Sequence, residues 1–206
     1  MKKNLSALLF LGAAWGICEA GIGYALHRMA VLLPGLPGAL MFPIGFYWMN
    51  KAQKATGEIS APLCIAAIAA TIKLADFLIP GADPIRVINP ALSILMEGLA
   101  VTAVYALGMR KRISVFIKVL GMGIIWRGMF AVYLYGISLI DLPALLVTSG
   151  MVTLLRFVLL ESFINSLVIL ACIHLATRLP THRPRPISPL AASAAILFAL
   201  SLQVLL

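Results

Sequence analysis

The sequence carries ionisable side chains inside stretches that are otherwise almost entirely apolar. A charge at the centre of a bilayer costs roughly 3 kcal/mol or more, so it persists where it pairs, meets water or binds a ligand. The acids in question are Glu19, Asp76, Glu97 and Glu161, and the bases are Lys73, Arg127 and Arg156. These side chains are the first candidates for binding a polar solute.

Two further polar residues belong to this group, one because of its helical spacing and one because of its position in the chain. Lys73 and Asp76 are three residues apart, which places both on one side of a helix. Glu161 and Asn165 are four residues apart and form a polar stripe in the same way. His27 lies at the end of the first apolar stretch, where it could contact the same solute. We therefore count Asn165 and His27 among the candidate substrate-binding residues.

The composition indicates that these charges belong to a membrane protein. Hydrophobic residues make up 62% of the 206 residues and charged residues 11%. A soluble domain carries about 45–50% apolar and about 25% charged residues. A water-soluble chain of this size could not bury so much apolar surface. We expect an all-α fold, a polytopic transmembrane helix bundle that forms a single integral membrane domain over residues 1–206.

The apolar stretches divide this domain into candidate spans, each of which needs roughly 20 residues to cross a bilayer. A six-helix core occupies residues 1–178, a basic, proline-rich linker follows at 179–188, and an extra hydrophobic span covers 189–206. The sequence is therefore compatible with either six or seven spans. One polar turn is expected over residues 50–54 and 56–58, and another over residues 80–84. The candidate spans are 5–26, 37–49, 61–79, 91–109, 113–134, 148–177 and 189–206.

The placement of basic residues predicts how the chain is oriented in the membrane. With the N-terminus inside, alternation leaves only Arg28 and Arg86 on outside loops, as the positive-inside rule requires. We expect the cytoplasmic (inner) membrane, with the C-terminus outside if there are seven spans. The net charge of +9 is thus a topology signal, and we expect no nucleic-acid partner. The inside loops hold Lys2, Lys3, Lys51, Lys54, Arg110, Lys111, Arg112, Arg178, Arg183 and Arg185.

This orientation brings most of the membrane charges to a similar depth. Apart from Glu161, which is near the middle of its span, they fall in the outer half of several different spans. Such a layer predicts a polar site open to the outside. The alternative is that the charges only form interhelical ion pairs that fix the bundle. Lys118, near the inner end of its span, is expected to snorkel to the interface.

Small residues line one side of the first span and allow another helix to approach closely. They are Gly12, Ala13, Gly16 and Ala20. They serve either ordinary packing within the chain or the docking of a partner protein.

Motifs for several enzyme classes are absent from the sequence. No Walker A or dinucleotide-binding glycine pattern occurs, and neither does a zinc-protease or serine-hydrolase signature. The cysteines Cys18, Cys64 and Cys172 lack metal-binding spacing. We therefore expect no metal and no cofactor, and we favour a transport subunit over an enzyme.

Residues 5–178 share a general architecture with a known family of transport proteins. The shared features are a small-residue first span (11–21), a proline- and glycine-rich first loop (27–38), and polar stretches at 72–76, 88–90 and 95–98. In these features the chain resembles the substrate-binding subunits (S components) of energy-coupling-factor transporters. A seventh span exceeds the family's usual six. The start Met1-Lys2-Lys3 lacks the metal site of its nickel and cobalt members.

The resemblance implies a function in vitamin uptake. Such a subunit captures a small, vitamin-like micronutrient from the outer side while embedded in membrane lipid. It docks through the small face of its first span onto a transmembrane coupling protein with ATPase subunits, and it catalyses no chemistry itself.

Two other functions fit the residues. An intramembrane enzyme could use Glu19, Glu97 or Glu161 with a base to act on a lipid or isoprenoid substrate. A proton- or ion-coupled carrier or a channel could use the same charged layer without further subunits.

Overall fold

The computed structural model describes residues 2–29, 36–108, 113–140, 142, 144–178 and 186–205. Throughout these ranges the chain forms helices and turns without any strand, so the prediction of an all-helical fold is confirmed. The helical segments are α1 (Lys2–Cys18), η1 (Glu19–Gly23), α2 (Tyr24–Met29), α3 (Leu36–Thr56), α4 (Ala61–Lys73), η2 (Leu74–Leu78), α5 (Pro84–Gly108), α6 (Val115–Ser138), α7 (Leu145–Thr148), α8 (Met151–Leu155), η3 (Arg156–Leu160), α9 (Glu161–Thr177) and α10 (Pro189–Leu205).

Several of these segments run on without interruption as longer helices. A π-helical turn, η1, joins α1 to α2, and a second π-helical turn, η3, joins α8 to α9. Within the described residues, five helices are long and apolar enough to cross a membrane. They are Asn4–Leu26, Ala61–Leu78, Pro84–Gly108, Val115–Ser138 and Met151–Leu175. Lengths and composition are therefore those of an integral membrane protein.

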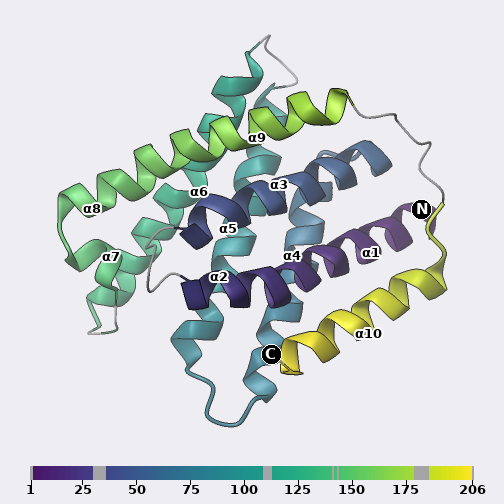
Figure 1. Cartoon of the computed structure of the whole chain (residues 1–206), viewed down its shortest axis with the longest axis horizontal. Coiled ribbons are helices and arrows are strands. Elements are labelled where there is room, and N and C mark those ends of the chain that lie inside the picture. The colour runs from purple at the N-terminus through teal and green to yellow at the C-terminus, as the bar shows by residue number, and fades with distance from the viewer. Residues whose placement is uncertain are drawn as a thin grey trace.

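The helices are arranged in two layers (Figure 1). In the front layer α9, α3, α1 and α10 lie side by side in that order, and α4, α5 and α6 cross behind them. The front helix α3 touches α1 and α9 within its own layer and α4 and α5 behind it. Residues on α3 are therefore well placed to meet side chains from both layers.

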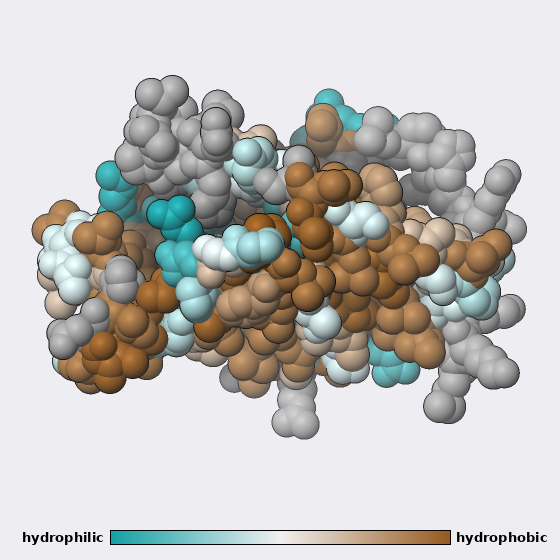
Figure 2. Space-filling view, turned by 90° about the horizontal axis from the view of Figure 1, so that it is seen from below, coloured by the Kyte–Doolittle hydropathy of each residue, from teal (hydrophilic) through white to brown (hydrophobic). Residues whose placement is uncertain are grey.

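The outer surface of the bundle is largely apolar. Figure 2 shows one face that is mostly covered by hydrophobic residues, with hydrophilic residues gathered in a few places. Large apolar side chains point outward, among them Val152 at 83% and Leu190 at 81% exposure. Water would solvate such a surface poorly, whereas lipid chains would not. The surface agrees with the helix lengths in indicating a membrane-embedded bundle.

Local sequence signals set the helix ends. Asp83 Oδ1 accepts a hydrogen bond from the Ile85 amide (3.0 Å) just ahead of α5, and Ser114 Oγ accepts one from the Ile117 amide (3.3 Å) at the start of α6. Gly57, with φ of 74°, ends α3, because a left-handed residue stops a helix.

One predicted turn is shorter in the structure, and one predicted helix begins earlier. A polar turn was expected over residues 50–54 and 56–58, but α3 continues to Thr56, so the turn begins at Gly57. Lysine, alanine and glutamine favour helices, and the first breaker is Gly57. Likewise α5 begins at Pro84 rather than at residue 91, because proline is tolerated in the first turn of a helix.

The small face of the first helix is occupied by the chain's own helices. A Cβ atom added to Gly12 would lie 2.7 Å from Ile68 Cβ, and one added to Gly16 would lie 2.9 Å from Ile72 Cδ1, both on α4. Ala13 packs with Ile72 and with α10, and Ala20 is buried. Gly12 and Gly16 are thus covered by α4, and Ala13 packs between α4 and α10. Docking of a partner on this face stays a prediction, and it would require these helices to move.

A hydrogen bond fastens α10 to the rest of the bundle. Gln203 is 5% exposed in a mostly apolar helix, and its Nε2 donates to Asp76 Oδ1 at 2.5 Å. The other carboxylate oxygen, Asp76 Oδ2, lies 2.8 Å from Lys73 Nζ. This polar cluster links the last helix to the end of α4 and η2.

Replacing Gln203 with alanine is expected to loosen α10. The substitution removes a buried hydrogen bond to a carboxylate, which should lower the free energy of unfolding by about 1–3 kcal/mol. Unfolding of the purified protein in detergent micelles measures this difference. The matched control is Ser201→Ala, an exposed residue of the same helix. Equal stability of the two variants would show that Gln203 does not hold α10.

Candidate functional site

The centre of the bundle holds a charged side chain, Arg127 of α6, which is 0% exposed. Its Nη2 donates to the backbone oxygen of Gly38 (3.1 Å) and to Asn165 Oδ1 (3.0 Å). Its Nη1 donates to Ser162 Oγ at 3.4 Å. The guanidinium group thereby connects α6 to α3 and α9.

Helix α9 supplies most of the partners of Arg127. Glu161, Ser162 and Asn165 share the side of α9 that faces α6, as the spacing of four between Glu161 and Asn165 predicts. Glu161 Oε2 lies 3.8 Å from Arg127 Nη2. Asn165 Nδ2 donates to Gly38 O at 3.1 Å and so closes a ring of contacts. The expected grouping of Arg127, Glu161 and Asn165 is thus present in the structure.

Aromatic rings surround the guanidinium group. Arg127 Cζ lies 4.4 Å from the ring centre of Trp126 and 5.4 Å from that of Phe157. Phe42 of α3 packs on Trp126 with ring centres 5.7 Å apart. Cations are attracted to the faces of such rings. The indole Nε1 of Trp126 is buried and has no hydrogen-bond partner among the described residues.

Glu97 of α5 is the second charged side chain that is buried in the bundle, at 4% exposure. It interacts with Ser93 through a side-chain hydrogen bond and lies within electrostatic reach of Glu19 and Arg127. Its Oε2 atom is buried and without a hydrogen-bond partner in the described part of the chain. A buried polar atom without a partner costs about 1–3 kcal/mol, which makes Glu97 a group that a ligand or water would stabilise.

Glu19 lies on the first helix at the start of the π-helical turn η1. Its Oε1 accepts a hydrogen bond from Trp15 Nε1 at 3.1 Å. The Trp15 ring and Glu97 both lie next to Gly45 of α3. A Cβ atom added to Gly45 would be 2.7 Å from Trp15 Cζ2 and 3.1 Å from Glu97 Oε2. Trp15 is thus hydrogen-bonded to Glu19 and shares the surroundings of Gly45 with Glu97.

One face of α3 contacts both halves of this polar layer. Gly38, Phe42 and Gly45 follow one another at spacings of four and three residues, which places them on one side of the helix. Gly38 meets Arg127 and Asn165, and Gly45 meets Trp15 and Glu97. Glycine is needed at Gly45 for close approach, because even one added carbon would overlap the indole ring.

The remaining predicted residues lie apart from this centre. Lys73 and Asp76 pair with each other and with Gln203 beside α10, although Lys73 remains within electrostatic reach of Glu19. Arg156 is exposed. The side chain of His27 lies outside the described residues, so its predicted role stays a prediction.

Sequence reasoning missed the parts of the site that carry no charge. The Gly38 carbonyl, Gly45, Ser162 and Trp126 were not among the candidate residues. A usable signal was the pair of glycines seven residues apart on the second span, since that spacing returns to the same helix face.

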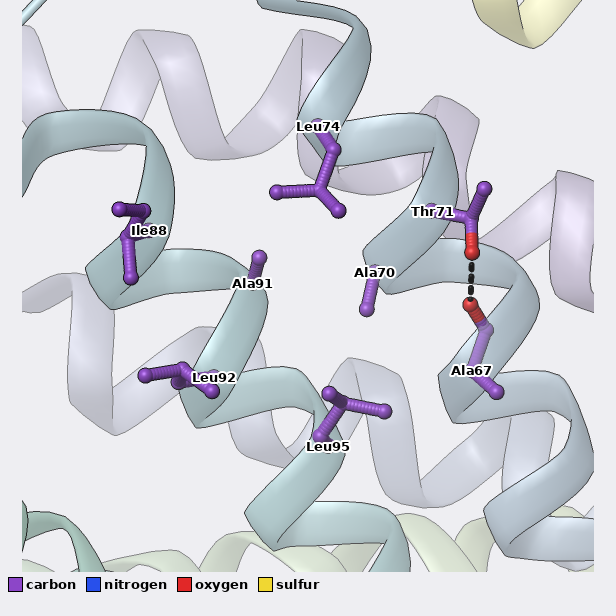
Figure 3. A pocket seen from close by; sticks show the side chains of 8 residues that line it. All are labelled: Ala67, Ala70, Thr71, Leu74, Ile88, Ala91, Leu92 and Leu95. Carbon is purple, nitrogen blue, oxygen red and sulfur yellow. Dashed lines mark hydrogen bonds between the residues drawn. The ribbon is translucent and has the colours of Figure 1, made fainter. Parts of the chain in front are cut away.

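The groove that Figure 3 displays is separate from this polar layer. It has a volume of about 300 Å³ and lies between α4 and α5, lined by Ala70, Leu74, Ala91 and Leu95 among others. Its one hydroxyl, that of Thr71, donates to Ala67 O within its own helix at 2.8 Å. The groove is thus an apolar feature of the outer surface and offers nothing to a polar solute.

Comparison with known proteins does not assign the chain to a family. No protein-family model, no curated protein and no solved structure matches the chain. Among the residues that the structure describes, no group of three or more His, Cys, Asp and Glu side chains could hold a metal ion. The chemistry available at the centre is therefore that of carboxylates, a guanidinium group, an amide and indole rings.

Substituting Gly45 tests the close contact between α3 and the two carboxylate-bearing helices. We expect Gly45→Ala to lower the free energy of unfolding by about 1–3 kcal/mol, because the added carbon must displace Trp15. The matched control is Gly121→Ala on α6, where nothing lies within 4 Å of an added Cβ. The control should be neutral or stabilising by up to about 1 kcal/mol. Similar effects of the two substitutions on unfolding in micelles would refute the tight packing at Gly45.

Proposed function

We propose that this chain is an integral membrane subunit that binds a small, micronutrient-like solute for uptake. The solute enters from the outer side of the cytoplasmic membrane, and the N-terminus lies inside. The six core spans build the site, and α10 is a seventh span. The binding groups are Arg127, Glu97 and the polar residues around them.

The observation that carries this proposal is the buried polar centre itself. Side chains from α1, α5, α6 and α9 and the backbone of α3 converge on it from distant parts of the sequence. Arg127 donates into this network through Nη1 and Nη2, but Arg127 Nε, Glu97 Oε2 and Trp126 Nε1 lack partners in the described part of the chain. A bound solute or an ordered water at this centre would satisfy these buried groups.

The two π-helical turns are a second, independent support. Glu19 opens η1, and Glu161 directly follows η3, so both carboxylates sit where the regular hydrogen-bond ladder is interrupted. Single π-helical turns inside longer helices occur frequently at functional sites. Such turns weaken a helix locally, which suits a bundle that must open to admit a solute to a fully buried arginine.

The chemistry of the centre suggests the kind of solute. Arg127 offers a positive charge, and the nearest carboxylate oxygen of the described residues, Glu161 Oε2, lies 3.8 Å from its Nη2. Glu97 offers an acceptor, Trp126 offers a donor, and aromatic rings cover the sides. A small molecule with several polar groups on a flat ring would satisfy these groups, and vitamin-like compounds have this chemistry. No nucleophile with an adjacent base occurs among these groups, which favours binding over catalysis.

The direct test is a search for bound small molecules in the wild-type protein and in Glu97→Gln. Glutamine keeps the shape of the side chain but removes the negative charge. Mass spectrometry of molecules released from purified protein should find a polar compound in the wild type. Its occupancy should fall about tenfold or more in Glu97→Gln, because a hydrogen bond to a charged group is lost.

The matched control is Glu58→Gln, which alters an exposed residue outside the helices. Occupancy and uptake into cells or liposomes should stay at the wild-type level in this variant. A wild-type protein that retains no small molecule, together with unchanged uptake in Glu97→Gln, would refute the proposed function. Turnover of a lipid substrate, or proton flux through liposomes holding this chain alone, would support the enzyme or carrier alternative instead.

A further inference from the structure

A groove of about 200 Å³ lies at the end of the bundle where α3 and α5 finish and α6 begins. Unlike the groove between α4 and α5, it presents polar side chains. Its polar lining consists of Asn50, Gln53, Tyr105 and Lys118. None of the residues that line the groove belongs to the candidate site, and the groove plays no part in the proposed function.

Lys118 reaches into this groove because Gly108 has no side chain. A Cβ atom added to Gly108 would lie 3.0 Å from Lys118 Cε and 3.4 Å from Lys118 Nζ. The lysine stem therefore lies across the last residue of α5, and its ammonium group is held at the groove. In the described part of the chain Lys118 has neither a hydrogen bond nor a carboxylate within ion-pair distance. This cation is available for an external anion.

The neighbouring polar groups suit the same kind of ligand. The Tyr105 hydroxyl donates to Asn50 Oδ1 at 3.4 Å, which leaves the Asn50 amide nitrogen facing away from that bond as a donor. Gln53, one turn further along α3, adds a second amide. One cation with two amide donors matches the oxygen atoms of a phosphate group.

Among the described residues near the groove, the neighbouring charged side chains add further positive charge. Lys51 and Lys54 are exposed at the end of α3, and the exposed Glu58 follows in the turn. Lys51 lies over the rings of Tyr47 and Trp48, at 5.5 and 5.3 Å from their centres. Two lysines and Lys118 against a single acid favour an anion over a cation.

Exposed apolar side chains beside the groove indicate that this anion belongs to a lipid. Leu107, next to Gly108, is 66% exposed, and Ile117, next to Lys118, is 58% exposed. Both face the surroundings of the bundle, where acyl chains would cover them. We propose that this groove binds the phosphate group of an anionic membrane lipid, with Lys118 as its charged contact and the acyl chains lying along Leu107 and Ile117. Basic pockets between transmembrane helices are typical sites for such headgroups.

The test compares lipid retention by the wild type and by Lys118→Met, which keeps an unbranched stem across Gly108 but removes the charge. The full chain is purified in micelles containing equal amounts of phosphatidylglycerol and phosphatidylcholine, and retained lipid is counted by native mass spectrometry. The wild type should prefer phosphatidylglycerol. The preference should fall about fivefold in Lys118→Met, since one lysine near a lipid surface contributes about 1 kcal/mol.

Controls separate this site from general charge effects and from misfolding. Arg86→Gln removes an exposed charge outside the groove, at the start of α5, and should leave the preference unchanged. Lys118→Arg should retain it. If Lys118→Met does not fold, Gln53→Ala provides the same comparison with a smaller loss.

Three results would overturn the proposal. The first is an equal preference in the wild type and Lys118→Met. The second is a loss of preference in Arg86→Gln as large as in Lys118→Met. The third is inorganic phosphate displacing phosphatidylglycerol at equal concentration, which would assign the groove to free phosphate. None of these results bears on the solute site around Arg127 and Glu97, so the two proposals fail separately.

Discussion

The bundle depends on the burial of one guanidinium group. Taking an arginine out of water is costly unless its donors find acceptors, and leaving such a group without partners costs about 3–5 kcal/mol. Arg127 meets this requirement at Nη1 and Nη2, with a backbone carbonyl of α3 and side chains of α9, whereas its Nε has no partner among the described residues. Those contacts fix how α3, α6 and α9 lie against one another, and the positions of the other polar groups follow from that arrangement.

Helix α3 makes this arrangement possible because it combines glycines with an aromatic residue on one face. At Gly38 the arginine reaches the backbone, and at Gly45 the Trp15 ring and Glu97 come close to the helix. Any larger residue at Gly45 would push the first helix and α5 away. The small size of Gly45 therefore lets Glu97 and the Trp15 ring, which holds Glu19, come close to α3.

The sequence allowed the class of fold and several members of the site to be predicted. A charge such as Arg127 or Glu97 stands out in an apolar stretch, and the spacing of Glu161 and Asn165 places them together on any helix. Pairing across helices could not be predicted, because it depends on how the helices cross. The Gly38 carbonyl is part of the site through its backbone alone, and no side-chain pattern reports a backbone acceptor.

A double-mutant cycle between Arg127 and Asn165 tests most directly whether the buried arginine organises the bundle. The free energy of unfolding would be measured in micelles for the wild type, Arg127→Lys, Asn165→Ala and the double variant. We expect a coupling free energy of about 1–3 kcal/mol, because each substitution removes the partner that the other residue needs. Strictly additive effects would contradict the account, since they would mean that the two side chains stabilise the bundle independently.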